Sequence, residues 1–349
     1  MTIEEVCAGI TSTDQQAMEG ARIHWDSIAH PLHSLGKLED VIVQIAGIQK
    51  TPQIAIKKKA LVVMCADNGV VAEGVTQSGQ EVTAIVSENF LNEKATASIL
   101  CRQTGADIVP IDIGMAADTR VRSCKVAYGT KNMAKDPAMS REEAIQAIMT
   151  GVQIVGELHQ QGYRVLATGE MGIGNTTTSS AIAAVLLNQS VEAVTGRGAG
   201  LSSQGLQRKI SVIQQAIQLH QPDPADAVDV IAKVGGFDIA GMAGVFLGGA
   251  YYHMPVVIDG FISCVAALCA SRICPEAAQY MIASHVSREP AAVMLLQAMD
   301  KQAFLTCDMC LGEGSGAVTL FPLLDMAAAV YHSMSTFDDN SMEHYQPLV

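Results

Sequence analysis

With 349 residues, of which 49% are hydrophobic and only 16% are charged, the chain is long and apolar enough to bury a large core. Its net charge of −13, from 22 basic and 35 acidic residues, argues against a nucleic-acid-binding protein. No apolar run reaches the length of a membrane span and the acidic N-terminus lacks the pattern of a secretory signal, so we expect a cytoplasmic protein that does not bind membranes.

The cysteines and histidines favour neither a disulfide framework nor a metal site. Nine cysteines, an odd number, are scattered through the chain, several of them inside apolar segments, as expected of reduced core residues. Cys307 and Cys310 form a C-x-x-C motif, but no second pair or His cluster accompanies them, so packing is favoured over a zinc or redox role. We therefore expect neither a metal nor a cofactor. The low charge content favours an oligomer that covers its apolar surface.

The first half of the chain alternates between helix and strand patterns. In order, we expect helices over 14–28 and 38–48, a strand over 60–66, helices over 82–92 and 95–104, a strand over 106–114 and a helix over 141–161. A polar loop that contains Ser78 follows the first strand, as either a substrate loop or a surface excursion. Residues 115–140 are expected to be irregular. Ser140 and Glu143 form a capping box at the start of the last helix.

A glycine-rich turn in the middle of the chain is the main candidate for a binding site. An apolar strand over 163–168 precedes it, and an alanine-rich helix follows, with Asn175 or a threonine from 176–178 as its N-cap. Such a turn presents backbone N–H groups to an anion. It fits neither the P-loop, which needs a lysine, nor the dinucleotide fingerprint, whose third glycine is a threonine here. A turn without a ligand is the alternative. Glu170 argues against it, because a carboxylate at an anion site needs a substrate hydroxyl or ring N–H to face.

The second half repeats the alternation. We expect a strand end with a three-glycine turn over 191–201, helices over 204–219, 227–234 and 239–251, and a strand over 254–258. A helix over 261–270, helices after Glu289 up to about 304 and an apolar segment over 318–330 are expected to follow. Four glycines in the 239–251 helix are expected to allow close packing against a neighbour. The tail, 333–349, is expected to be partly disordered. The pattern predicts an α/β fold with a doubly wound parallel sheet and a ligand at the carboxyl ends of its strands.

Charged side chains follow several strands and are expected on one rim of the sheet: Asp67, Glu170, Arg197, Asp259, His285 and Glu313. Glu313 lies between Gly312 and Gly314, where burial would raise its pKa and let it act as a base near neutral pH. A turn glutamate that points to water is the alternative. For His285, a hydrogen bond to the backbone is the alternative to a chemical role.

Taken together, the motifs resemble the nicotinate-nucleotide–dimethylbenzimidazole phosphoribosyltransferase family of cobamide (vitamin B12) synthesis, across nearly the whole chain. The matching motifs are Ser34-Leu-Gly-Lys-Leu-Glu39, Ala66-Asp-Asn-Gly-Val70 with Glu73-Gly-Val75, Gly169-Glu-Met-Gly-Ile-Gly-Asn-Thr-Thr177, Thr195-Gly-Arg-Gly-Ala-Gly200, Lys233-Val-Gly-Gly-Phe-Asp238, Ile258-Asp-Gly-Phe-Ile-Ser263, Ser284-His285 with Ser287, and Leu311-Gly-Glu-Gly-Ser-Gly316. The resemblance implies a Rossmann-like catalytic domain over 56–319, a smaller helical domain from 1–55 and 320–349, and a homodimer.

The resemblance also implies the reaction and its residues. Nicotinate mononucleotide and an aromatic base would give an α-ribotide phosphate and nicotinate, and Glu313, the catalytic residue, would take the proton of the base. The phosphate would bind to the Gly172-Ile173-Gly174-Asn175 turn and to Lys209. The other substrate-binding positions that the resemblance implies are Glu170, Met171, Gly198, Asp259, Ser287, Leu311, Ser78 and Val86.

The chain departs from the family pattern around the base pocket. Asn68 stands where the family has His, Gly79 where it has Pro, and His30 where it has the first residue of a Pro-Pro pair. Val86 stands where the family often has a glutamine that contacts the base. The accepted base is therefore left open among benzimidazoles, purines and phenols, and a phenol would attack through its oxygen. A non-catalytic subunit paired with a paralogue and a nucleotide-binding module are alternatives. A nicotinamide-dependent oxidoreductase rests on the sheet architecture alone.

Overall fold

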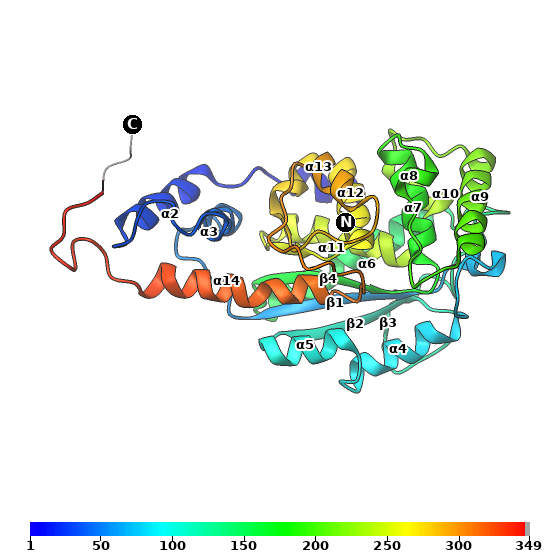
Figure 1. Ribbon diagram of the computed structural model, residues 1–349, viewed down its shortest axis with the longest axis horizontal. Helices are drawn as coiled ribbons and strands as arrows, with labels where there is room; N and C mark the ends of the chain where they lie inside the picture. The colour runs from blue at the N-terminus through cyan, green and yellow to red at the C-terminus, as the bar shows by residue number, and fades with distance from the viewer. Residues whose placement is uncertain (346–349) are drawn as a thin grey trace.

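The apolar runs of the sequence form a six-stranded sheet in the computed structural model, which describes residues 1–345 (Figure 1). The strands are β1 (Lys59–Ala66), β2 (Asp107–Gly114), β3 (Arg122–Ser123), β4 (Val165–Met171), β5 (Val256–Ile258) and β6 (Met281–Ala283). They lie in the order β3-β2-β1-β4-β5-β6, and all neighbouring pairs are parallel. The order reverses between β1 and β4, which confirms the predicted doubly wound α/β fold.

Side chains of β1 alternate between two hydrophobic cores, and all eight of its residues are buried. Val62 and Met64 face the first core, to which α6 (Arg141–Gln160), α7 (Asn175–Leu186), α9 (Ser203–His220), α10 (Ala227–Val234), α11 (Phe237–Tyr251) and α12 (Phe261–Ile273) contribute. Leu61 and Val63 face the second core, to which α3 (Lys37–Gln49), α4 (Glu81–Leu91), α5 (Thr96–Thr104) and α14 (Ser315–Ser333) contribute. Because both faces of the sheet are covered, a ligand reaches it at the strand ends.

Helices α6 and α11 touch through their backbones at glycines. A Cβ on Gly151 of α6 would overlap the Gly241 carbonyl oxygen of α11, and a Cβ on Gly244 would overlap the Ile148 carbonyl oxygen of α6. The predicted close packing of the glycine-spaced helix is therefore confirmed. Helix α11 also packs on β1 and β4, the strands that lead into the candidate site.

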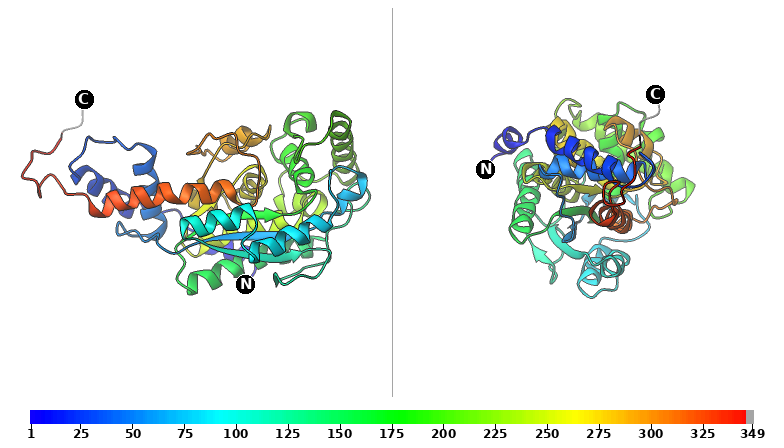
Figure 2. Two further views of the ribbon diagram at one scale, coloured as in Figure 1. Left: turned by 60° about the horizontal axis from the view of Figure 1, so that its bottom comes forward. Right: turned by 90° about the vertical axis from the view of Figure 1, so that its left-hand side faces the viewer.

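Helices from both chain ends lie together at one end of the elongated molecule (Figures 1 and 2). Here α2 (Gln15–Ser27) and α3 pack beside α14, with the rings of Trp25 and Tyr331 5.1 Å apart. These helices share the second core with the sheet, while α1 (Ile3–Gly9) packs on the first core. The division into 1–55 with 320–349 and 56–319 stays a prediction.

The tail over 333–349 is predicted to be partly disordered, and its first part packs on the rest of the molecule. Thr336 forms a β-bridge with Ile28, and the side chain of Phe337 is fully buried. Residues 346–349 of the predicted tail lie outside the described residues.

Within residues 1–345, no helix is both long and apolar enough to cross a membrane.

Three local predictions are wrong. The strand expected over 191–201 is a helical turn, α8 (Val191–Val194), capped by Ser190 and followed by a loop. The region expected to be irregular contains the short strand β3. Strand β6 precedes the segment in which helices were expected, and α13 (Ala292–Ala298) lies inside that segment as predicted. The N-cap of α7 is Gly174, in a left-handed conformation (φ 94°), instead of Asn175 or a threonine. Two 3₁₀ helices, Gly69–Glu73 and Pro275–Tyr280, complete the structure.

Candidate active site

A pocket of about 310 Å³ opens where β4, β5 and β6 end and α14 begins. It is lined by Val86, Glu170, Met171, Gly172, Ile173, Asn175, Thr176, Gly198, Ala199, Asp259, Gly260, Phe261, Ile262, Ser263, His285, Ser287, Glu289, Cys310, Leu311, Gly312 and Glu313. This is the carboxyl edge of the sheet, next to the point where the strand order reverses, the expected ligand position in this architecture.

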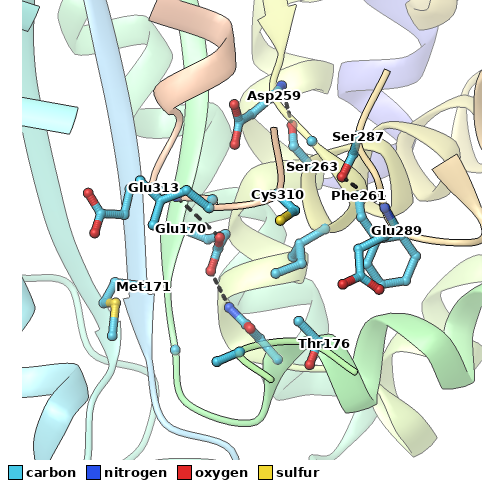
Figure 3. A pocket seen from close by; sticks show the side chains of 18 of the residues that line it. Glu170, Met171, Thr176, Asp259, Phe261, Ser263, Ser287, Glu289, Cys310 and Glu313 are labelled. Atoms are coloured by element: carbon cyan, nitrogen blue, oxygen red, sulfur yellow. Dashed lines mark hydrogen bonds between the residues drawn. The ribbon is translucent and has the colours of Figure 1, made fainter. Parts of the chain in front are cut away.

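The pocket brings together most of the predicted site residues, including the Glu313 turn and the Gly172–Asn175 turn (Figure 3). Gly174, Lys209 and Ser78 do not line it. Gly174 lies behind the pocket wall, where a Cβ would come 2.8 Å from Val71. Ser78 belongs to a loop that reaches the edge of the site through neighbouring Gln77, whose amide donates to the Gly200 carbonyl oxygen.

Glu313 lies in a turn of three left-handed residues, with φ angles of 95° at Gly312, 62° at Glu313 and 89° at Gly314. Nine other non-glycine residues of the described chain have a positive φ, so this conformation shapes the turn and does not by itself mark a functional residue. A Cβ on Gly312 would lie 2.5 Å from Oε1 of Glu170, and a Cβ on Gly169 would overlap the Glu313 carbonyl oxygen. These glycines allow the Glu313 turn to lie directly on the end of β4.

The carboxylate of Glu313 is half-buried and tied to a helix. Its Oε2 accepts a hydrogen bond of 3.1 Å from the backbone N–H of Ala97, in the first turn of α5. Burial raises the pKa of Glu313, the nearby Asp259 carboxylate raises it further, and the Ala97 N–H opposes both. The net effect is a raised pKa, which suits a group that accepts a proton near neutral pH.

Glu170 is buried at the end of β4, and its oxygens bind protein groups. Oε1 accepts from the backbone N–H of Glu313 at 3.4 Å, and Oε2 accepts from the Nδ2 group of Asn175, which also donates to Asp238 at 3.1 Å. Burial, and then the Asp238 and Asp259 carboxylates, raise the pKa of Glu170 well above its usual value. Hydrogen-bond donors of the protein therefore already satisfy both carboxyl oxygens of Glu170, and a substrate hydroxyl or ring N–H is not needed to explain its place in the turn.

Asp259, at the end of β5, acts as a remote cap for α14. Its Oδ2 accepts from the Gly314 N–H at 3.2 Å and its Oδ1 from the Ala317 N–H at 3.0 Å. Gly314, the N-cap residue of α14, has no side chain to do this. Burial raises the pKa of Asp259, whereas His285 and the backbone N–H groups lower it. Asp259 and Glu170 thus hold the Glu313 turn from two strands.

The predicted phosphate turn begins α7, and Lys209 of α9 lies behind it. The buried Nζ of Lys209 donates to Thr176 Oγ1 at 2.8 Å and to the Gly196 carbonyl oxygen at 3.2 Å. Burial lowers the pKa of Lys209 to about 8. Its charge therefore acts on the pocket through Thr176 and across the glycine turn at 196–200.

Several pocket residues were not among the predicted site residues: Thr176, Ala199, Gly260, Phe261, Ile262, Ser263, Glu289, Cys310 and Gly312. His285, which was expected on this rim of the sheet, lines the pocket as well. Thr176, Phe261 and Ser263 lie inside the motifs of the glycine-rich turn and the Asp259 strand, so these motifs could have identified them. No motif marks Glu289. Within the described part of the chain, no group of three His, Cys, Asp or Glu side chains is placed to hold a metal ion.

Known proteins resemble this chain over almost its full length. A phosphoribosyltransferase family profile matches residues 10–342. The nicotinate-nucleotide–dimethylbenzimidazole phosphoribosyltransferase of Ruminiclostridium cellulolyticum is 47% identical over 351 residues, which cover 100% of both chains. Its counterpart from Acetivibrio thermocellus is 46% identical over 96% of both chains. The crystal structure of CobT from Thermus thermophilus superposes with a TM-score of 0.89 and 36% identity, covering 95% of this chain and 100% of that one.

Proposed function

Because this chain belongs to the phosphoribosyltransferase family of the nicotinate-nucleotide–dimethylbenzimidazole type, we propose that it moves 5-phosphoribose from nicotinate mononucleotide to an aromatic lower-ligand base of a cobamide. The products are an α-ribotide phosphate and nicotinate. One observation carries the proposal: the half-buried Glu313 carboxyl and the Gly172–Asn175 turn line the same pocket.

In this reaction Glu313 is the general base. It takes the proton of the base as a ring nitrogen, or the oxygen of a phenol, attacks C1′ of the ribose. Nicotinate leaves with the bonding electrons, and positive charge develops on the ribosyl carbon. The carboxyl oxygens of Glu170, Asp259 and Glu313 line the pocket and stabilise this charge, Glu170 as a dipole because its raised pKa favours the neutral form. Attack from the face opposite to nicotinate inverts the anomeric carbon from β to α.

The substrate phosphate would lie against the Gly172–Asn175 turn, where the N-terminus of α7 favours an anion. Lys209 supplies the positive charge behind this turn through Thr176. Gly198 and Ser287 line the same pocket and complete the proposed substrate-binding set.

The proposed base subsite is largely apolar. Val86, Met171 and Leu311 line the pocket beside the Glu313 turn, with Val86 at the position where the family often has a glutamine. An apolar wall binds a flat aromatic ring without a demand for a matched hydrogen bond. We therefore propose that the chain accepts a broad set of bases, phenols included, and that benzimidazole is one member of it.

A panel assay tests the function directly. The protein is incubated with nicotinate mononucleotide and, in separate reactions, a benzimidazole, a purine and a phenol, and the products are identified by mass. We expect nicotinate release that depends on the added base, together with an α-ribotide of matching mass. If no base releases nicotinate, a non-catalytic subunit is favoured, and addition of a paralogue from the same source then decides whether a heterodimer is the active form.

Composition also bears on the assembly and the location of the protein. We propose a homodimer, because the low charge content favours burial of apolar surface between subunits. The proposed cytoplasmic location rests on the scattered cysteines, which are typical of a reducing compartment. Sedimentation of the purified protein and of its mixture with a paralogue would distinguish the homodimer from a heterodimer.

A further inference from the structure

Glu289 lies in the loop between β6 and α13 and contributes a carboxyl group to the wall of the pocket (Figure 3). Its side chain packs on the glycine turn at 196–200, where a Cβ on Gly196 would overlap Oε2 of Glu289. That oxygen is buried and makes no hydrogen bond with any described residue. A buried carboxylate oxygen without a donor is costly, so its place in the pocket needs a reason.

The surroundings of Glu289 are those of an anion-binding corner. Lys209 and the backbone N–H of Gly198 both favour the charged form of Glu289, whereas burial, the largest effect, raises its pKa. A Cβ on Gly198 would lie 3.6 Å from the Lys209 Nζ atom and 2.9 Å from Thr176 Oγ1, so the glycine turn and the buried ammonium meet here. Lys209 and the Gly198 N–H, which stabilise the ionised carboxylate of Glu289, are the groups expected to stabilise a bound phosphate as well.

We propose that Glu289 is a resident carboxylate at the phosphate corner, and that a phosphate binds there only when this side chain takes up a proton or moves aside. The inference rests on the proposed function, because it assumes that the phosphate of the substrate binds beside Thr176 and Gly198. Glu289 thereby sets the affinity and pH dependence of phosphate binding.

The sign of the pH dependence follows from the charges. A bound phosphate dianion repels an ionised Glu289, so the complex favours the protonated carboxyl, and phosphate affinity falls as pH rises. The charged groups that act on Glu289 are Lys209 of α9 and Arg288 of its own loop. The other titratable side chains that line the pocket are Glu170, Asp259, His285, Cys310 and Glu313. Because Lys209 and the phosphate also titrate, a comparison with a neutral variant is required.

The test compares Glu289→Gln with the wild type by calorimetry, using inorganic phosphate, nicotinate mononucleotide and its phosphate-free riboside as ligands. Removal of one negative charge beside a dianion is expected to tighten phosphate and mononucleotide binding on the order of tenfold at pH 8, with a smaller gain at pH 6. The affinity for the riboside should stay unchanged. Glu19→Gln on α2 removes the same charge from an exposed, distant ion pair and should change none of these affinities.

Equal or weaker phosphate binding by Glu289→Gln would overturn the inference, and so would equal gains for the riboside. Glu289→Asp, which keeps the charge but withdraws it from the turn at 196–200, should fall between wild type and Gln, and it replaces Gln if that variant does not fold. If the wild type binds mononucleotide and releases nicotinate, and the Glu289 variants bind phosphate with the wild-type affinity, only the inference about Glu289 is rejected. A wild-type protein that binds neither phosphate nor mononucleotide rejects the proposed function as well.

Discussion

The carboxylate of Glu313 accepts a hydrogen bond of 3.1 Å from the backbone N–H of Ala97, although the two residues are 216 positions apart in the chain. Ala97 lies in the first turn of α5, where backbone N–H groups have no partner within the helix. Ala95, the N-cap residue of this helix, has no side chain that can accept from them. Glu313 therefore serves as the cap of α5, and this contact fixes its carboxylate at the pocket wall.

Replacement of Glu313 by Gln tests the role of its carboxylate as the base. The amide oxygen can still accept from Ala97, so substrate binding should be kept, while loss of the proton acceptor should lower kcat by about 10²–10⁴-fold. In the wild type, burial raises the pKa of Glu313 above its usual value of 4.5. A base acts only when ionised, so wild-type kcat/KM should fall as pH drops through that raised pKa. The variant should lack this acidic limb.

The measurement is a pH–rate profile of nicotinate release for both proteins, with mononucleotide binding measured in parallel. An unchanged kcat in Glu313→Gln would remove Glu313 from its role as the base. A retained acidic limb would assign that limb to another group in the pocket.

Asp259 is expected to act on the reaction through position, by holding the turn that carries Glu313. Asp259→Asn replaces one of the two side-chain oxygens that accept from the backbone N–H groups of Gly314 and Ala317, so the first turn of α14 should loosen. We expect a loss of about 1–2 kcal/mol in the free energy of unfolding, with a fall in kcat that exceeds any rise in KM. Chemical denaturation and steady-state kinetics measure the two effects.

Asp226→Asn is the matched control for Asp259→Asn. Asp226 caps α10 with Oδ1, which accepts from the backbone N–H groups of Val228 and Asp229, while its Oδ2 pairs with Arg141. Asp226→Asn therefore also loses one of two occupied acceptor oxygens, and Asp226 does not line the pocket. It should lose similar stability and keep the wild-type kcat. If both variants lose activity in proportion to their stability, Asp259 has no specific link to the Glu313 turn.

The sequence alone could predict the elements whose signals are local. The uninterrupted apolar run of β1 and the Ser140 and Glu143 capping box of α6 both appear in the structure as predicted. The strand expected over 191–201 failed because a short apolar run also fits a helical turn, which the Ser190 cap stabilises here. β3 and β6 have two and three residues, too few to show a strand period.

The candidate site could be predicted only where its residues lie in motifs. The glycine turns mark Glu170 and Glu313 along the chain. Their contact, however, joins residues 143 positions apart and depends on how β4 and the start of α14 are placed in the fold. The capping of α14 by Asp259 could not be predicted for the same reason, because Asp259 and the start of α14 come together only through the order of the strands in the sheet. Lys209 carries no local sign of its burial behind Thr176.

Val86 is expected to influence which base is accepted. Val86→Gln on α4 places an amide at the apolar pocket wall, and helix propensity tolerates the change. The kcat/KM of a base that can hydrogen-bond to this amide should rise. The kcat/KM of a base that cannot should fall, because the buried amide is then left without a partner. We expect the ratio of kcat/KM between a benzimidazole and a phenol to rise on the order of tenfold. Val82→Gln, one turn earlier and outside the pocket lining, should leave that ratio unchanged.

Gly312→Ala should separate backbone strain from damage to the site. At φ 95°, an alanine is strained by about 1–2 kcal/mol, and its Cβ would lie 2.5 Å from Oε1 of Glu170. That oxygen accepts from the Glu313 N–H, so the clash should displace the Glu313 turn and lower kcat as well as stability. Gly105→Ala provides the comparison, since Gly105 has φ 66° and a Cβ added there would meet no heavy atom within 4 Å. It should lose similar stability with unchanged kcat, and equal kcat in the two variants would mean that the Glu170 contact does not position Glu313.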